Sequence, residues 1–253
     1  ALADAGLEGT SSVYDWDLIN AVEVVGRNLD ELPPGERREL VVSAHEDFRD
    51  NVAAHLDELP RAFVHNDPND YNLLVSDVDD SIAGIIDFGD ATETVAIAEL
   101  AIALAYSIQG EFDPLACIAQ TVSAFHELRP LSELEQGMLP RLIWMRLCTT
   151  VTMAAAAARR EPDNAYLQVS AEPAWRAIEQ LASAGGRQLY ETIRDACLGQ
   201  VGAPVDAEAT RIRDARGQYL GSSLSLSYGD PLHIVHGSKQ FLFDKRGRAF
   251  LDC

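Results

Sequence analysis

Two polar motifs on either side of a predicted β-hairpin constrain the fold of this chain more than any other feature. The first spans residues 65–72 (HNDPNDYN) and the second spans residues 87–89 (DFG). Two apolar runs lie between them, separated by an acidic segment (DVDD) that is typical of a turn. If the two runs pair as antiparallel strands, Asn72 lies opposite Ile86 or Asp87, at a distance of about 5 Å.

This pairing predicts that oxygen-bearing side chains gather at the open end of the hairpin. Asn72 and Asp87 offer the kind of oxygen ligands that Mg²⁺ prefers. Asp67 precedes the hairpin by a tight loop and projects into the same space, so it is a candidate base for a reacting hydroxyl group. His65 stands just before Asp67, a position that suits orienting the loop better than acting as a base.

The regular elements are predicted from periodicity and breakers. Apolar residues at helical spacing predict helices, and short apolar runs predict strands. The predicted helices are 14–30, a second one that ends before Pro60, 95–109, 113–128, 131–160 and 171–199 with a break near 185–186. The predicted strands are 62–65, the two strands of the hairpin, and three short strands at 232–235, 240–243 and 249–252.

The residues at 65–72 and 85–90 resemble the catalytic loop and the metal loop of the aminoglycoside phosphotransferase and choline kinase superfamily, and in particular its hydroxylysine-kinase-like branch. The segment 99–101 (ELA) resembles the helix start that follows the metal loop in that family. Asn66 stands where the family usually has Gly or another polar residue. The resemblance implies an α+β, mainly helical fold, a protein-kinase-like C-lobe with a small catalytic β-hairpin.

The resemblance also implies roles for the candidate residues. Asp67 becomes the catalytic base, and Asn72 and Asp87 become the Mg²⁺ ligands. His65, Asn72 and Asp87 together form the cofactor side, with ATP as the phosphoryl donor. The expected reaction is transfer of a phosphoryl group to the hydroxyl of a small amino alcohol, such as hydroxylysine or ethanolamine.

A cationic amine on such a substrate calls for acidic and aromatic side chains nearby. Asp90, Glu93 and Tyr71 are the candidate substrate contacts, and Asp90 resembles a second acidic residue of the hydroxylysine-kinase-like branch. Asp90 suits a solvated turn equally well. Trp144 is a further candidate, although its apolar surroundings favour core packing.

The part of a kinase that covers the nucleotide phosphates is not predicted in this chain. Residues 1–64 contain neither a lysine nor a Gly-rich loop, and a kinase uses both on the ATP phosphates. We therefore expect a fragment that is inactive alone and that belongs to a longer protein. Residues 1–200 are the expected phosphotransferase C-lobe without its N-lobe.

The last part of the chain resembles a different family. Residues 220–253 are similar to the opening of a class-III PLP-dependent aminotransferase. Residues 201–230 are the expected linker, and residues 231–253 are the expected start of the aminotransferase domain. PLP would bind in a downstream part, since neither Lys239 nor Lys245 suits the PLP lysine. The expected parent is a kinase–aminotransferase or kinase–phospholyase fusion, which could form a homo-oligomer through its aminotransferase part.

Composition excludes several partner classes. A formal net charge of −20 argues against nucleic acid and anionic membranes as partners. No apolar run reaches the roughly 18 residues needed to cross a bilayer. The four cysteines are scattered, which argues against a zinc site and fits reduced thiols in a cytoplasmic protein. Two other functions stay open: a non-catalytic domain for nucleotide binding or scaffolding, and a magnesium-dependent hydrolase.

Overall fold

The computed structural model describes most of the chain between residues 14 and 199 and three short strands near the C-terminus. The described residues are 14–76, 81–161, 171–199, 234–238, 241–244 and 249–251. The chain divides into two compact units, residues 1–199 and residues 200–253. The first unit contains both polar motifs of the hairpin region.

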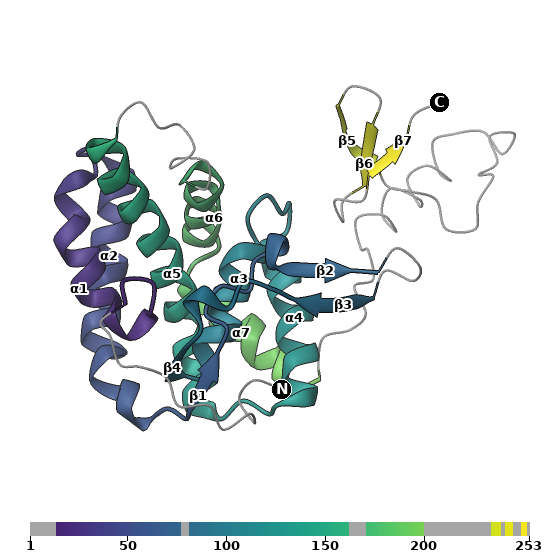
Figure 1. Ribbon diagram of the computed structural model, residues 1–253, viewed down its shortest axis with the longest axis horizontal. Helices are drawn as coiled ribbons and strands as arrows, with labels where there is room; N and C mark the ends of the chain where they lie inside the picture. Colours follow the sequence, from purple (N-terminus) through teal and green to yellow (C-terminus); the bar gives the residue numbers. More distant parts are fainter. Residues whose placement is uncertain are drawn as a thin grey trace, which may run out of the picture. The chain divides into compact units, whose positions relative to one another are not determined.

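The first unit is mainly helical, as Figure 1 shows, and its core is built around one long helix. The α-helices are α1 (Ala21–Asn28), α2 (Glu36–Asn51), α3 (Ile97–Ser107), α4 (Pro114–Leu128), α5 (Glu133–Arg160), α6 (Ala171–Ala184) and α7 (Gly186–Cys197). Helix α5 contacts α1, α2, α3, α6 and α7. Each predicted helical region contains an α-helix, and the break between α6 and α7 lies at Gly185, which has a φ of 85°. The predicted helix 14–30 is shorter than expected, since α1 covers Ala21–Asn28, and the second predicted helix ends at Asn51 and is followed by a 3₁₀ helix, η3 (Ala53–Glu58).

Local sequence signals define both ends of α5. The hydroxyl of Ser132 accepts the main-chain N–H of Glu135 over 3.2 Å, and the Glu135 carboxylate accepts the N–H of Ser132 over 2.9 Å. This reciprocal pair is a capping box. Arg159 and Arg160 occupy the last turn, where cations complement the helix dipole. Between the ends, side chains such as Leu142 are fully buried, each contributing about 1.5–3 kcal/mol.

Two small antiparallel sheets carry the polar motifs. The strand pairs are β1 (Arg61–Val64) with β4 (Thr92–Val95), and β2 (Leu73–Val75) with β3 (Ile82–Ile85). The main-chain N–H of Ile86 donates to the carbonyl of Asn72 over 2.9 Å, which confirms the predicted hairpin register. Strand β4 was not predicted, and the predicted helix that begins at Val95 begins at Ile97 instead.

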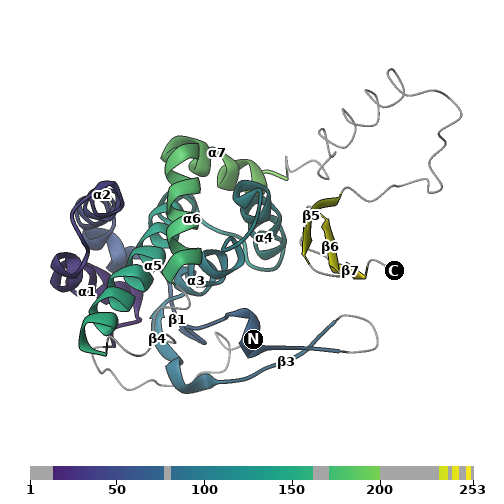
Figure 2. The same cartoon turned by 90° about the horizontal axis from the view of Figure 1, so that it is seen from above.

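The sheets determine where the motifs lie. Strand β1 leads into the 65–72 loop, and the 87–90 segment leads into β4, so the hairpin β2–β3 is enclosed between two paired strands. Figure 2 shows the hairpin extending away from the helices. Its side chains are correspondingly open to solvent, with Ile82 65% exposed and Val75 57% exposed. The two motifs therefore meet at the base of the hairpin, next to α3.

The described part of the second unit is a three-stranded antiparallel sheet. Its strands are β5 (Ile234–Ser238), β6 (Phe241–Asp244) and β7 (Ala249–Leu251), in the order β5-β6-β7. All three predicted strands are confirmed, although β5 begins two residues later and ends three residues later than predicted. The predicted linker at 201–230 lies outside the described residues.

In the parts of the chain that the structure covers, no helix combines the length and the apolar character that a membrane span needs. Helix α5 is long enough, but polar and charged residues interrupt it along its length.

Candidate active site

The loop after β1 is held by buried polar contacts. His65 is 0% exposed, and its Nε2 donates to the carbonyl of Ile86 over 2.8 Å. Its Nδ1 accepts the main-chain N–H of Asp67 over 3.3 Å. The next residue, Asn66, has a left-handed φ of 66°, and its main-chain N–H donates to the Glu99 carboxylate over 2.9 Å. His65 thus joins the loop to the end of β3, with both ring nitrogens engaged by the protein and neither left for a cofactor.

The carboxylate of Asp67 is held on both oxygens. Its Oδ2 accepts from the amide nitrogens of Asn69 over 2.8 Å and Asn72 over 3.1 Å, both from its own loop. Its Oδ1 accepts from the hydroxyl of Tyr106 on α3 over 2.7 Å. Because the Asn72 amide nitrogen also donates to the Asp67 carbonyl over 2.8 Å, the Asn72 side-chain oxygen is the atom that could coordinate a cation.

A buried arginine lies behind this carboxylate. Arg146 on α5 is 2% exposed, and its Nη2 is 2.9 Å from the Tyr106 hydroxyl and 3.6 Å from the Asp67 Oδ1. Its Nη1 donates to the carbonyl of Trp16 over 3.2 Å, and its guanidinium carbon lies 4.7 Å from the centre of the Trp16 ring. Three distant segments therefore converge on Asp67.

The second motif is built differently. Asp87 has a left-handed φ of 62° and starts a short 3₁₀ turn, η5 (Phe88–Asp90). Its side chain is exposed and, among the described residues, it makes no hydrogen bond or ion pair. The ring of Phe88 lies 4.9 Å from that of His65, which links the two motifs. Asp87 is therefore free to bind a cation at little cost.

Burial shifts several pKa values around the site. Burial raises the pKa of the Glu99 carboxyl, and the hydrogen bond from Asn66 opposes this shift. Burial also raises the pKa of Tyr106, which keeps its hydroxyl a neutral donor. The pKa of Tyr14 is raised by burial first and by its hydrogen bond to Asp90 second.

The predicted substrate contacts lie in three different settings. Asp90 is half-buried and accepts a short hydrogen bond from the hydroxyl of Tyr14, on which the charges of Arg146 and Asp67 also act. Tyr71 is 92% exposed and follows Asp67 on the same loop. Glu93 is exposed on β4, opposite Phe63. Of the three, Asp90 is the one connected to the charged residues around Asp67, because its hydrogen-bond partner Tyr14 lies near them.

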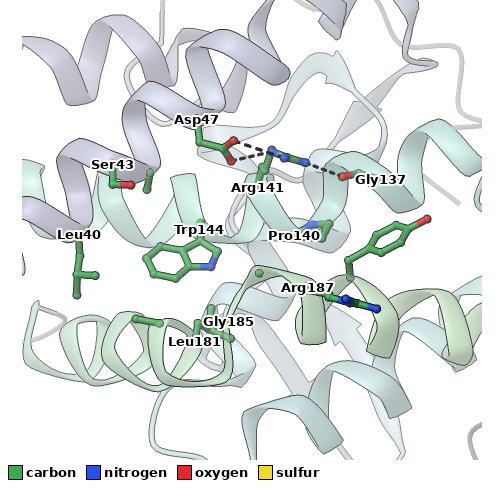
Figure 3. A pocket seen from close by; sticks show the side chains of 14 residues that line it. Leu40, Ser43, Asp47, Gly137, Pro140, Arg141, Trp144, Leu181, Gly185 and Arg187 are labelled. Carbon is green, nitrogen blue, oxygen red and sulfur yellow. Dashed lines mark hydrogen bonds and ion pairs between the residues drawn. The ribbon is translucent and has the colours of Figure 1, made fainter.

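Trp144 lies away from these residues. It lines a cavity of about 850 Å³ between α2, α5, α6 and α7. Figure 3 shows its indole in this cavity beside Arg141, which pairs with Asp47 over 2.7 Å. Residues 141 and 144 occupy the face of α5 turned away from Arg146, as the helical repeat of 3.6 residues requires. Trp144 therefore lies on the side of α5 opposite the residues around Asp67, and its contact with a substrate stays a prediction.

The donor set fits a hard cation with few protein ligands. Across the described residues, no cluster of three or more His, Cys, Asp or Glu side chains could hold a metal ion. Asn72 and Asp87 offer one amide oxygen and one carboxylate on either side of the hairpin base. That set matches Mg²⁺, which usually binds one or two protein carboxylates and takes its other ligands from phosphates and water.

Sequence reasoning missed Tyr106 and Arg146. Tyr106 is separated from Asp67 by 39 residues and from Arg146 by 40, so no local pattern joins them. A signal was nevertheless present, because Arg146 interrupts the apolar run 142–148 in the middle of a helix. A charged side chain in such a position is seldom buried without a partner.

Comparison with known proteins supports the resemblance of residues 65–90 to the phosphotransferase family. The chain is 27% identical to hydroxylysine kinase from Bos taurus over 186 residues, which is 70% of this chain and 49% of that protein. It is 28% identical to hydroxylysine kinase from Mus musculus over 187 residues, again 70% and 49%. The chain thus spans about half the length of the curated relatives it matches.

One solved structure also matches. It is the amicoumacin kinase hAmiN in complex with AMP-PNP, Ca²⁺ and Ami, with a TM-score of 0.40 and 13% identity over 70% of this chain and 63% of that chain. The model of the phosphotransferase enzyme family, APH, matches residues 2–134, which is more than half of the 253 residues. This match includes β1, the 65–72 loop, the hairpin and α3. The chain belongs to the phosphotransferase enzyme family.

Proposed function

We propose that this chain carries the catalytic residues of an ATP-dependent kinase that phosphorylates the hydroxyl of a small amino alcohol. Hydroxylysine is the first candidate acceptor, because the curated relatives are hydroxylysine kinases, and ethanolamine is the next. The observation that carries the proposal is the Asp67 carboxylate, held on both oxygens beside Asn72 and close to the Asp87 motif. An in-line phosphoryl transfer needs a fixed carboxylate of this kind to orient the attacking hydroxyl.

The hydrogen bonds indicate which oxygen of Asp67 would meet the acceptor. Each carboxylate oxygen has two lone pairs. Oδ2 already accepts from Asn69 and Asn72, whereas Oδ1 accepts from Tyr106 alone. In the proposed reaction, the acceptor hydroxyl donates to the remaining lone pair of Oδ1. Asp67 would orient this hydroxyl and receive its proton while the hydroxyl oxygen bonds to the γ-phosphorus of ATP and the bond from that phosphorus to the departing ADP breaks.

The opposite side of the site is where the nucleotide would bind. Asn72 and Asp87 would hold Mg²⁺ there, and the ion would neutralise charge on the nucleotide phosphates. The hairpin offers an apolar platform for the base, since Leu74 is 47% and Ile86 is 43% exposed. Exposed apolar side chains next to a cation site suit a ligand with an aromatic and a charged end.

The proposal for the acceptor amine rests on Asp90. Its carboxylate is half-buried and oriented by Tyr14, whose hydroxyl also lies within reach of the charges on Asp67 and Arg146. An acid held in this way next to the proposed base would select acceptors that carry a positive charge. Glu93 and Tyr71, which are exposed, would contribute less because solvent screens them.

We further propose that residues 231–253 open a class-III aminotransferase-fold domain that follows the kinase in the full-length protein. The sheet β5-β6-β7 supports this proposal, because three short strands are expected at that point of such a domain. PLP would bind in its downstream part. An aminotransferase or phospholyase would then act on the phosphorylated amine.

The direct test is a substrate screen with the full-length protein, ATP and Mg²⁺. Phosphorylation of hydroxylysine, ethanolamine or a related amino alcohol is expected, and Asp67→Asn should lose turnover while the folded variant still binds nucleotide. Turnover that survives in Asp67→Asn would contradict the role of this residue. Nucleotide-dependent stabilisation without turnover would point to a binding domain, and phosphate release without an acceptor would point to a hydrolase.

A further inference from the structure

We infer that Tyr106 and Arg146 are positioning residues that fix the rotation of the Asp67 carboxylate from outside its own loop. This inference rests on the proposed function, because it assigns these residues a part in the same phosphoryl transfer. Asn69 and Asn72 come from the loop itself and hold Oδ2. Tyr106 comes from α3 and holds Oδ1, and Arg146 comes from α5 and holds Tyr106.

Chemistry fixes the direction of these hydrogen bonds. A guanidinium only donates, an ionised carboxylate only accepts, and a phenol has a single proton to donate. The proton of Tyr106 must therefore point to Asp67 over 2.7 Å, while its oxygen accepts from Nη2 of Arg146 over 2.9 Å. The hydrogen bonds therefore run in one direction, from Arg146 to Tyr106 and from Tyr106 to Asp67. The position of the guanidinium thus determines where the phenol hydroxyl points.

Arg146 itself has little freedom to move. It is 2% exposed, with Nη1 bonded to the Trp16 carbonyl and with its guanidinium between two rings, 4.7 Å from the Trp16 centroid and 5.4 Å from the Tyr106 centroid. Among the described carboxylates, Asp67 is the one within ion-pair distance, at 3.6 Å. A buried cation is costly unless it stays close to its counter-charge. The attraction between Arg146 and Asp67 therefore restrains both side chains.

The contact with Tyr106 defines the rotation of the Asp67 carboxylate, which the contacts within the loop would leave poorly defined. The terminal torsion of an Asp side chain is broad and roughly two-fold. Two donors on Oδ2 restrain one oxygen, and the third donor, from Tyr106, restrains the other. Without Tyr106, the carboxylate could turn about this torsion and move the lone pair of Oδ1 away from the acceptor hydroxyl. The effect would fall on the chemical step and leave the nucleotide side unchanged.

The experiment is a double-mutant cycle on the full-length protein with Tyr106→Phe, Arg146→Met and both together. Each single variant should lower the single-turnover rate about 10- to 100-fold, the loss expected for a misplaced reacting group. The KM for ATP should stay close to that of the wild type. The double variant should lose about as much as the worse single variant, because Arg146 acts through Tyr106. Arg146→Lys should recover part of the rate, since it restores a positive donor.

Matched controls separate this effect from a general loss of structure. Arg141→Met removes an arginine from the opposite face of α5, and Tyr190→Phe removes a hydroxyl from a half-exposed tyrosine on α7. Both should keep the wild-type rate. Should Arg146→Met fail to fold, Tyr106→Phe, which removes a single atom, still tests the inference.

Two results would overturn it. A Tyr106→Phe variant with wild-type rates, or losses that multiply in the double variant, would show that Tyr106 and Arg146 do not act together on Asp67. A wild-type protein without kinase activity would instead overturn the proposed function, and this inference with it. The two failures are distinguishable because the first requires an active wild type.

Discussion

The two aspartates of the site, Asp67 and Asp87, have the same side chain in opposite environments. The side chain of Asp67 is 19% exposed and accepts hydrogen bonds from three residues. Asp87 is exposed and, within the described residues, its carboxylate has no such partner. The fold thus supplies the whole environment of one carboxylate and leaves the other to solvent. In the proposed reaction, the side that meets the acceptor would be organised in advance, while the side of Asp87 would remain open to its ligands.

The backbone does not explain this difference. Asn66, next to Asp67, and Asp87 both have left-handed φ values, 66° and 62°, which are uncommon for residues other than glycine. What differs is the support. The N–H of Asn66 donates to the partly buried Glu99, which lies in the first turn of α3. The loop of Asp67 is therefore anchored to α3, whereas the turn of Asp87 is held through its neighbours Phe88, which contacts His65, and Asp90, which accepts from Tyr14.

The difference between the two aspartates is tested most directly by neutralising each of them in turn. Asp87→Asn should lower kinase activity by about 10²–10³-fold through the loss of charge stabilisation. Its melting temperature should stay near the wild-type value, because surface changes usually cost less than about 0.5 kcal/mol. Asp67→Asn should lose activity as well, but it should also unfold more easily, by about 1–3 kcal/mol, because Arg146 loses its counter-charge.

Activity assays and thermal unfolding of both variants decide the matter. The contrast depends on the stability measurement, because both variants are expected to lose activity. Equal melting temperatures for the two variants would show that the contacts of Asp67 contribute no more to stability than the solvent around Asp87.

A second prediction compares the contributions of the helical core and of the hairpin to stability. Ile102 is fully buried on α3, one turn before Tyr106, while Ile82 is 65% exposed on β3. Ile102→Ala should destabilise the protein by about 2–5 kcal/mol, the usual cost of a cavity. Ile82→Ala, the matched control, should cost less than about 0.5 kcal/mol. Denaturant unfolding measures both, and comparable costs would mean that the hairpin also packs against something.

The smallest expected effect concerns pH and Glu99. Burial raises the pKa of this carboxyl above its ordinary value of 4.5, so the folded state favours the protonated form. Its contribution to stability is fully present below the unfolded pKa and is lost as pH rises through the folded pKa. Relative to Glu99→Gln, which keeps an acceptor for Asn66, the wild type should become less stable as pH rises from about 4 to 7. A stability difference that does not change with pH would contradict this reading.

The sequence was sufficient for the elements whose pattern is local. Apolar spacing predicted the helices, and the alternation of apolar runs around one turn predicted the register that places Asn72 beside Ile86. Strand β4 was missed because three of the four residues in its sequence, TETV, are polar and its partner β1 lies far away in the chain. Tyr106 and Arg146 were missed for the same reason, since tertiary packing alone brings them to Asp67. The catalytic and metal roles of Asp67, Asn72 and Asp87 stay predictions.

The pairing of β1 with β4 has a consequence for how the site is lost. These two strands form the base of a closed loop of chain that contains the 65–72 loop, the hairpin and the Asp87 turn. If this base opens, the segment loses its main-chain pairing and depends on contacts with residues outside it, those of Asn66 with Glu99, Asp67 with Tyr106 and Asp90 with Tyr14. Local opening should therefore weaken the proposed site as a whole, and hydrogen exchange of the β1 and β4 amides would report the free energy of that opening.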